Sequence, residues 1–436
     1  MATQFTQEER PNWKTPFFTI WIGQAVSLLG SQLVQFALIW YLTRETGSAV
    51  VLTTATLVAM LPQIVLGPIV GSLVDRGNRR RFMIAADSTI ALLTVGLAVL
   101  FATGLIQIWH IYAIMFLRSL AGSFHGPSFT ASTSLMVPKE QLSRVQGLNQ
   151  MLNGGLAILS APLGALLLEI LPMQGILAID VVTALVAVTC LFFVAIPQPE
   201  RKLAVGQGPT TVWQDMVFGF KYVISWPGLL IVLLMATLIN FLLTPASSLS
   251  PLYVTNHFGG GAQELAWLQS AFGLGIVLGG TILGVWGGFQ RRIITAMGGL
   301  IGLGAGMFIM GVTPANAFPI AISAMLLGGI MQPIVNGSLG AILQATVDPE
   351  MQGRVFTLVF TAATAISPLG LLIAGPLSEI YGIQTWYIIG GAICALAGLY
   401  GFISKSVMTI EDGRPGDRDE VAGATPSPAK AGALDY

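Results

Sequence analysis

Three charged side chains lie inside long apolar stretches of the sequence, where a charge is costly: Asp87, Arg118 and Asp180. Arg118 could form an ion pair with either carboxylate, and either carboxylate could accept a proton. Other roles are also open. Arg118 could be a structural arginine satisfied by backbone carbonyls or a carboxylate, Asp87 a local hydrogen-bond acceptor or a partner of nearby arginines, and Asp180 a residue that reaches water. The residue types therefore indicate a site that pairs or transfers charge in an apolar environment.

A second group of polar side chains, mostly amides, stands near aromatic residues in the same kind of stretch. It comprises Gln24, Gln32, Gln35, Phe36, Asn149, Asn240, Phe241, Gln332 and Asn336. Amides beside aromatic rings suit an amphipathic organic solute better than a sugar or a multiply charged ion, so we predict that these residues line a substrate cavity. Hydrogen bonds between helices are the alternative role for about half of them.

The composition requires that membrane helices carry these residues. Of 436 residues, 54% are hydrophobic and only 9% are charged, and the mean hydropathy is +0.77. Apolar segments of about 20 residues, the length that spans a bilayer, recur from end to end. A soluble enzyme would need more charged surface than 20 basic and 20 acidic side chains provide. We therefore expect an all-α polytopic membrane protein.

Apolar runs broken by charge, glycine, proline or polar clusters predict twelve transmembrane helices. They lie at roughly 17–42, 49–71, 82–104, 109–129, 146–170, 175–196, 228–249, 264–287, 293–313, 317–343, 355–378 and 383–404. All lysines and arginines except Arg44 and Arg118 fall on one side of these spans. The positive-inside rule therefore predicts a multi-pass protein of the cell (cytoplasmic, or inner) membrane with both termini cytoplasmic.

Two pairs of segments repeat six spans apart. Residues 137–145 align without gaps on 347–355, and residues 161–164 match 367–370. Two parallel repeats of six helices are the plan of a rocker-switch transporter, which holds its substrate near the midplane between the halves. The predicted divisions are a cytoplasmic segment 1–16, a six-helix bundle 17–196, a cytoplasmic linker 197–227 with an amphipathic helix, a second bundle 228–404 and a disordered cytoplasmic tail 405–436.

The loop between the second and third spans carries a motif that resembles a known family, the major facilitator superfamily. Residues that match the family signature are Gly71, Leu73, Asp75, Arg76, Arg79 and Arg80. Asn78 stands where the family usually has glycine. Asp-Arg-x-Asn-Arg, with the later Gly353-Arg354-Val355-Phe356, is similar to the branch of bacterial macrolide-efflux and siderophore-exporter proteins. The resemblance covers residues 15–405, implies two pseudo-symmetric six-helix bundles and favours efflux.

The resemblance also implies roles for single residues. It places Arg118 on the span-four arginine that the family links to proton coupling, with Asp87 and Asp180 as its candidate partners. It places Asp75 against the start of helix eleven, where a helix N-terminus carries partial positive charge. The implied cytoplasmic gate, a latch of the outward-open state, comprises Gly71, Asp75, Arg76, Arg79, Gly353 and Arg354.

A further implied feature is the antiporter motif of span five, which Pro162 and Gly164 match in part. Small residues at this place would let helices five and eight approach closely, which favours export. Ordinary packing of small residues between helices is the alternative.

Motifs for nucleotide or covalent chemistry are absent from the sequence. It contains no Gly-x-x-x-x-Gly-Lys-Ser/Thr, so ATP is not expected as the energy source, and neither His-Glu-x-x-His nor Gly-x-Ser-x-Gly, so we predict that the chain is not an enzyme. His110, His125 and His257 lack the spacing of metal ligands and are interpreted as packing residues. We expect no cofactor, no metal and no nucleic acid partner.

These observations favour a secondary active transporter, a proton-coupled exporter of macrolide-like or siderophore-like amphipathic small molecules that works by alternating access. Its expected partners are the small-molecule substrate, protons and the lipid bilayer, and we expect it to function as a monomer. One alternative is an importer or facilitator of a nutrient or metabolite in the same fold. The other is a membrane sensor or scaffold that does not transport.

Overall fold

The computed structural model describes residues 13–138, 141–197, 222–347, 355–356, 359 and 361–413, and the secondary structure of these residues is helical without strands. The twelve long helices are α1 (Lys14–Thr46), α2 (Ala49–Arg76), α3 (Arg79–Ala102), α4 (Ile108–Met136), α5 (Leu142–Ile170), α6 (Met173–Phe193), α8 (Pro227–Phe258), α9 (Ala262–Trp286), α10 (Arg292–Val312), α11 (Phe318–Thr346), α13 (Ser367–Tyr381) and α14 (Ile383–Ile403). A short α15 (Lys405–Met408) and a 3-10 turn, η2 (Ile410–Asp412), follow.

The helices confirm the predicted all-α membrane fold. Eleven of them, counted over the described residues, are long and apolar enough to cross a membrane. The twelfth, α4, has 29 residues and is more polar because it carries Arg118, His125 and several serines. Each predicted span overlaps one of the twelve helices, and most predicted ends lie within a few residues of the helix ends.

Turn residues at two helix junctions explain how neighbouring helices reverse direction. Gly47 ends α1 with φ of 58°, a left-handed conformation that glycine adopts without strain. Ser48 then begins α2 by accepting a hydrogen bond from Val51 N. Asn78 begins α3 in the same way, accepting from Arg81 N at 3.1 Å with φ of −85°. The asparagine that replaces glycine in the charged motif is therefore a helix cap and needs no positive φ.

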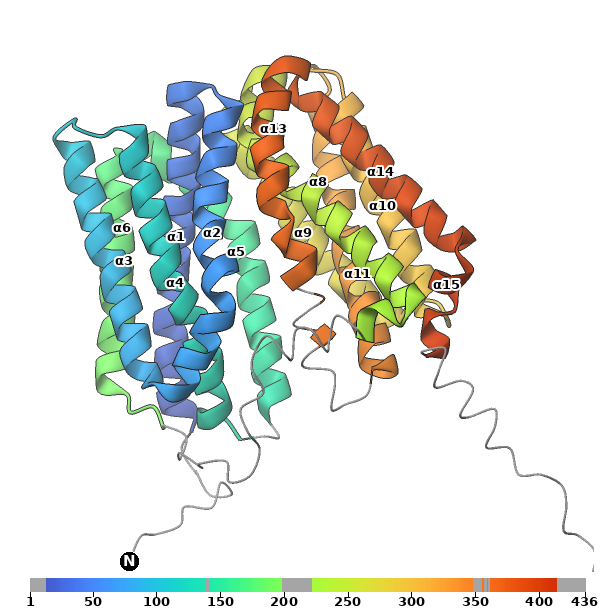
Figure 1. Ribbon diagram of the computed structural model, residues 1–436. Helices are drawn as coiled ribbons and strands as arrows, with labels where there is room; N and C mark the ends of the chain where they lie inside the picture. Colours follow the sequence, from blue (N-terminus) through green and yellow to red (C-terminus); the bar gives the residue numbers. More distant parts are fainter. Residues whose placement is uncertain are drawn as a thin grey trace, which may run out of the picture.

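The helices form two bundles, α1–α6 and α8–α14, which stand side by side in Figure 1. The packing scheme of one repeats in the other. In the first bundle α3 packs on α4 and α6, and α1 on α5 and α6; in the second, α10 packs on α11 and α14, and α8 on α13 and α14. Between the bundles α5 packs on α9, and α13 packs on α2. Because α5 corresponds to α13 and α9 corresponds to α2, these two contacts are equivalent. The two halves are thus pseudo-symmetric, as the sequence repeats predict.

The two bundles contact each other at one of their ends and near the middle of their helices. We call this end, which carries the Gly47, Leu171 and Gly382 junctions, the distal end; it is uppermost in Figure 1, at the opposite end of α1 from Lys14. Side-chain hydrogen bonds that cross between the halves include Ser48 Oγ to Glu379 Oε1 at 2.7 Å, Thr56 Oγ1 to Ser248 Oγ at 2.6 Å, Ser270 Oγ to Ile158 O at 3.0 Å and Gln263 Nε2 to Glu169 Oε1 at 3.3 Å. The structure therefore represents a state in which the distal ends are held together.

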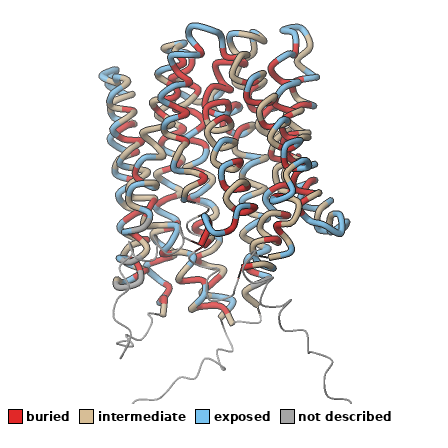
Figure 2. The backbone as a smooth tube through the Cα atoms, turned by 45° about the vertical axis from the view of Figure 1, so that its right-hand side comes forward, coloured by how far each residue is buried: buried red, intermediate tan, exposed pale blue. Residues whose placement is uncertain are grey.

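Large apolar side chains cover the outward faces of the helices. Leu92, Phe193 and Val285 are 72%, 86% and 86% exposed. Figure 2 shows exposed segments along the outside and buried ones where helices meet, with a dense buried group at the upper, distal end. Apolar surface of this extent fits hydrocarbon rather than water as the solvent.

The described parts of the linker and tail pack together. The predicted linker helix lies mostly outside the described residues, but Tyr222, Val223 and Trp226 form a buried cluster with Val407 and Ile410. The tail was predicted to be disordered from residue 405, and this boundary is too early, because Val407 and Ile410 anchor α15 and η2 against the second bundle. Residues 414–436 lie outside the description.

Candidate functional site

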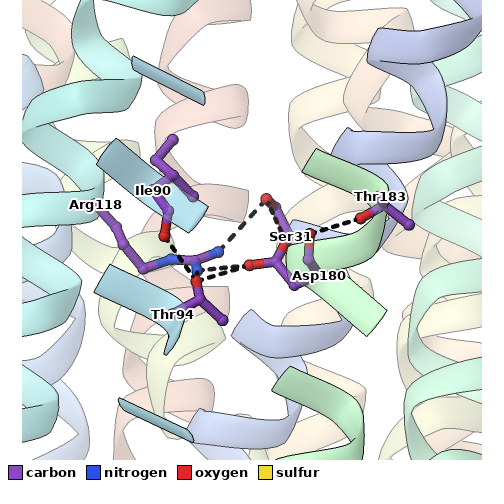
Figure 3. Close-up of polar contacts among 6 residues, drawn as sticks. All are labelled: Ser31, Ile90, Thr94, Arg118, Asp180 and Thr183. Atoms are coloured by element: carbon purple, nitrogen blue, oxygen red, sulfur yellow. Dashed lines mark hydrogen bonds and ion pairs between the residues drawn. The ribbon is translucent and has the colours of Figure 1, made fainter. Parts of the chain in front are cut away.

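The first buried polar cluster centres on an ion pair between α4 and α6. Arg118 Nη1 lies 2.6 Å from Asp180 Oδ2, and the side chain of Asp180 is fully buried. Thr94 Oγ1 lies 2.9 Å from the same carboxylate oxygen, and Ser31 Oγ donates to Oδ1 at 3.0 Å. Arg118 also contacts both hydroxyls, so four helices meet at this pair (Figure 3). We call Ser31, Thr94, Arg118 and Asp180 the arginine layer.

Glycines on α1 allow the arginine layer to form. A Cβ atom on Gly30 would lie 3.1 Å from Asp180 Cα, and one on Gly23 would lie 2.9 Å from Cys190 Sγ. These two glycines are two helical turns apart and share the face of α1 that packs on α6. The backbone of α1 can therefore come close enough for Ser31 to reach the carboxylate.

A second polar cluster joins α1, α3 and α4. Asp87 accepts from Gln24 Nε2 at 3.0 Å, and its other oxygen lies 3.4 Å from His125 Nε2. The same ring nitrogen lies 2.8 Å from Gln24 Oε1. Because both neighbours of Nε2 are acceptors, this nitrogen must carry a hydrogen. Asp87 and Gln24 are 4% and 2% exposed, so the cluster, which we call the histidine layer, is shielded from solvent.

The two layers are related by a shift of seven residues on each of three helices. The pairs are Gln24 and Ser31, Asp87 and Thr94, and His125 and Arg118. Seven residues make almost two turns of helix, so the side chains of each pair point the same way, about 10.5 Å apart. Each helix thus supplies one polar group to each layer.

The structure separates the residues that the sequence suggested for one charge site. Arg118 is paired with Asp180, which does not reach water, whereas Asp87 belongs to the histidine layer. His125, which the sequence interpretation assigned to packing, is part of that layer. Ser31 and Thr94 are not among the site residues that the sequence predicts. The shared shift of seven residues is the sequence signal that could have found all three.

The predicted cavity residues do not line a single cavity. Asn240, Gln332 and Asn336 line a hollow of about 120 Å³ between α8, α10 and α11. Gln24 belongs to the histidine layer, and Asn149 accepts a hydrogen bond from Trp21 Nε1 at 2.8 Å.

The remaining predicted cavity and packing residues divide between exposed and packed positions. Gln32 and Gln35 are exposed on α1, and Phe241 packs against Trp386. Phe36 is buried, and a Cβ atom on Gly164 would lie 2.8 Å from its ring, so this glycine makes room for the aromatic side chain within the first bundle. Pro162 lies inside α5.

The predicted gate can be described only in part. Gly71 lies in α2, while the side chains of Asp75 and Arg76, and residues 353–354, are outside what the structure describes. Arg79 is buried and donates to Ala131 O at 2.8 Å. Arg80 donates to Leu191 O and Phe192 O at 2.7 and 2.5 Å, where it satisfies carbonyls at the end of α6. These two arginines tie the start of α3 to α4 and α6.

Comparison with known proteins gives concordant results. The sequence model described as Major Facilitator Superfamily matches residues 20–253 and 229–431. Macrolide efflux protein A from Streptococcus pyogenes is 34% identical over 386 residues, covering 88% of this chain and 95% of that protein. Multidrug efflux pump Tap from Mycolicibacterium fortuitum is 23% identical, covering 86% and 91%. Among solved structures, the nucleoside transporter NupG superposes with a TM-score of 0.66 at 12% identity, covering 88% of this chain and 98% of that one.

Proposed function

Because the chain belongs to the major facilitator superfamily, we propose that it is a secondary active transporter that exports amphipathic small molecules in exchange for protons. The observation that carries this proposal is the 34% identity to macrolide efflux protein A over most of both chains. The relationship to multidrug efflux pump Tap supports the same direction of transport. Substrates would be macrolide-like or siderophore-like compounds that combine a large apolar surface with a few polar groups.

The histidine layer is the proposed site of proton binding. A proton on Asp180 would neutralise the partner of Arg118 and leave a buried guanidinium unpaired, which is strongly unfavourable. Asp87 instead faces an amide and an imidazole, and a proton can be held between carboxylate and ring without breaking an arginine ion pair. Arg118 and Asp180 would then act as positioning residues that fix the helices around that proton site.

The proposed orientation follows from the distribution of basic residues. We place both termini in the cytoplasm and the protein in the cell membrane, so the distal end faces outward. The contacts across the distal end then correspond to the state open toward the cytoplasm, in which an exporter takes up its substrate. We propose that one copy of the chain is sufficient for transport.

The substrate is proposed to bind between the halves near mid-membrane. Exposed Gln32 and Gln35 on α1, and the hollow lined by Asn240, Gln332 and Asn336, supply amides for its polar groups. The hollow of about 120 Å³ is smaller than a macrolide, so it would take one substituent of the substrate rather than the whole molecule.

Transport in inverted membrane vesicles tests this function. A radiolabelled macrolide should accumulate when the vesicle lumen is made acidic, and Asp87→Asn should abolish this accumulation while exchange of labelled for unlabelled substrate continues. Exchange needs binding and alternating access but no net proton movement, so it is the internal control. Accumulation that ignores the imposed gradient would contradict proton coupling, and net inward flux in whole cells would indicate an importer.

A further inference from the structure

A hollow of about 460 Å³ lies at the distal end between the two halves, separate from both polar layers. One wall is the α1–α2 turn, residues 46–49; the other is formed by the ends of α8 and α13 and the start of α14. Its volume falls within the range of about 300–1,000 Å³ that is usual for sites of small organic ligands. Size and position therefore permit a ligand that touches both halves.

A buried hydroxyl in the wall of this hollow lacks a partner. Ser378 is 6% exposed, and its Oγ has no hydrogen-bond partner among the described residues. Leaving a buried hydroxyl unsatisfied costs about 1–3 kcal/mol, so native proteins rarely retain one without a reason. Its oxygen is shielded from the hollow as the side chain stands, and a rotation of the serine side chain about χ1 would present it to a ligand there.

A carboxylate, that of Glu379, follows this serine in the sequence and also lines the hollow. Glu379 lines the hollow and reaches across to the other half, where its Oε1 accepts from Ser48 Oγ at 2.7 Å and from Val50 N at 3.4 Å. These bonds place the carboxylate at the start of α2, where the helix N-terminus carries partial positive charge. Oε2 makes no hydrogen bond with the described residues, so one oxygen remains for a ligand.

The other polar groups of the wall are neutral or already engaged. His257 Nε2 lies 2.8 Å from Thr313 O, and its Nδ1 contacts Gln384. Asn256 is exposed at the rim and offers an amide. Glu379 is thus the only acidic side chain among the described lining residues, and the wall contains no lysine or arginine.

We propose that this distal hollow is a binding site for small organic ammonium compounds. The ammonium would donate to Glu379 Oε2 and, after rotation of the serine side chain, to Ser378 Oγ, and the organic part would fill the remaining space beside the α1–α2 turn. An anion would be repelled by the carboxylate, and a neutral compound would forgo the charge-assisted bond, which is about twice as strong as a neutral one. The site depends on neither the direction nor the coupling of transport.

Calorimetric titration of the purified full chain with three compounds of one shape tests the site. The probe is 2-phenylethylammonium; 2-phenylethanol and phenylacetate are its neutral and anionic counterparts. We expect binding of the ammonium probe, with at least tenfold weaker binding of the alcohol and none of the anion, since a charge-assisted hydrogen bond corresponds to about tenfold or more in affinity.

Three variants then assign the binding to this hollow. Glu379→Gln can still accept from Ser48 but lacks the charge, and it should weaken probe binding about tenfold. Ser378→Ala should weaken it severalfold. Glu169→Gln is the matched control. Glu169 lies near the end of α5, as Glu379 lies near the end of α13, and it accepts a hydrogen bond from the other half, but it does not line the hollow. Equal binding by the parent chain and Glu379→Gln would overturn the proposal, whatever the transport assay shows.

Discussion

The described interior of the first bundle contains two carboxylates, Asp87 and Asp180, with Arg118 and His125 beside them, whereas the described interior of the second bundle has buried serines and threonines and the part-buried His257, but no buried carboxylate. The helix pairs correspond one to one, so this difference is not one of architecture. It lies in what fills the space between equivalent helices. One bundle is joined by charges and hydrogen bonds that a proton can change, and the other must be joined by something else.

Close backbone contacts at glycines join the second bundle. A Cβ atom on Gly304 of α10 would lie 2.7 Å from Gly391 O of α14, and one on Gly275 of α9 would lie 2.8 Å from Gly329 Cα of α11. In the first bundle Gly23 and Gly30 bring α1 close to α6 in the same way, but Gly96 of α3 meets nothing within 4 Å. Contacts of this kind do not respond to protonation. Among the described residues, the buried carboxylates therefore belong to the first bundle, and close backbone contacts at glycines are more frequent in the second.

The largest expected effect comes from removing one member of the arginine layer. Asp180→Ala leaves the guanidinium of Arg118 buried without its ion pair, which should destabilise the protein by about 3–5 kcal/mol. We expect a large fall in the yield of folded protein and in its thermal unfolding temperature. The double variant Asp180→Leu with Arg118→Met should recover folding but not proton-driven transport. A single variant as stable as the parent would mean that the pair does not hold this bundle together.

The next effect tests the glycine contacts of the second bundle. A Cβ atom on Gly279 would lie 2.7 Å from the carbonyl carbon of Ile330, so Gly279→Ala forces α9 away from α11 and should cost about 1–3 kcal/mol. Gly280 is the adjacent control, because a Cβ there meets nothing within 4 Å. Gly280→Ala should leave the thermal unfolding temperature unchanged. Equal behaviour of the two variants would remove the proposed difference between the bundles.

A smaller change in stability, with a large change in coupling, is expected in the histidine layer. His125→Gln keeps a hydrogen-bond donor near Asp87 but not the imidazole, so stability should fall by about 1 kcal/mol while gradient-driven export is lost. His110→Gln is the control, because His110 caps the start of α4 and glutamine can serve at that position. Undiminished gradient-driven export by His125→Gln would remove His125 from the proton site.

The smallest effect concerns the contact between the bundles. Thr56→Val removes the hydroxyl that faces Ser248 across the distal end, which should shift the balance between conformations by about 0.5–1.5 kcal/mol without altering the unfolding temperature. Distances between spin labels placed on the two halves at the distal end should then include a larger share of long distances, from molecules in which the halves have separated there. Thr281→Val is the control, because its hydroxyl bonds only within its own helix. An unchanged distance distribution would show that this contact does not hold the state.

Span number and the pseudo-symmetric plan could be predicted from the sequence, because hydrophobic length and basic residues report directly on a bilayer. The partner of Arg118 could not. Asp87 and Asp180 are both acidic residues in apolar helices, and only the packing of α4 and α6 against α3 brings Asp180 to the arginine. His125 was misinterpreted because a single histidine carries no spacing signal of its own. Its relation to Arg118 becomes informative only when the same shift is seen on α1 and α3.

The shift of seven residues also has a mechanical consequence. In the first bundle α4 runs opposite to α1 and α3, and it is joined to them at two levels. Sliding α4 along its axis by a single turn, about 5.4 Å, would misalign both levels at once. Rotation of α4 about its axis would withdraw Arg118 and His125 together. The two levels therefore fix the register of α4 against α1 and α3, so that these three helices should tilt together.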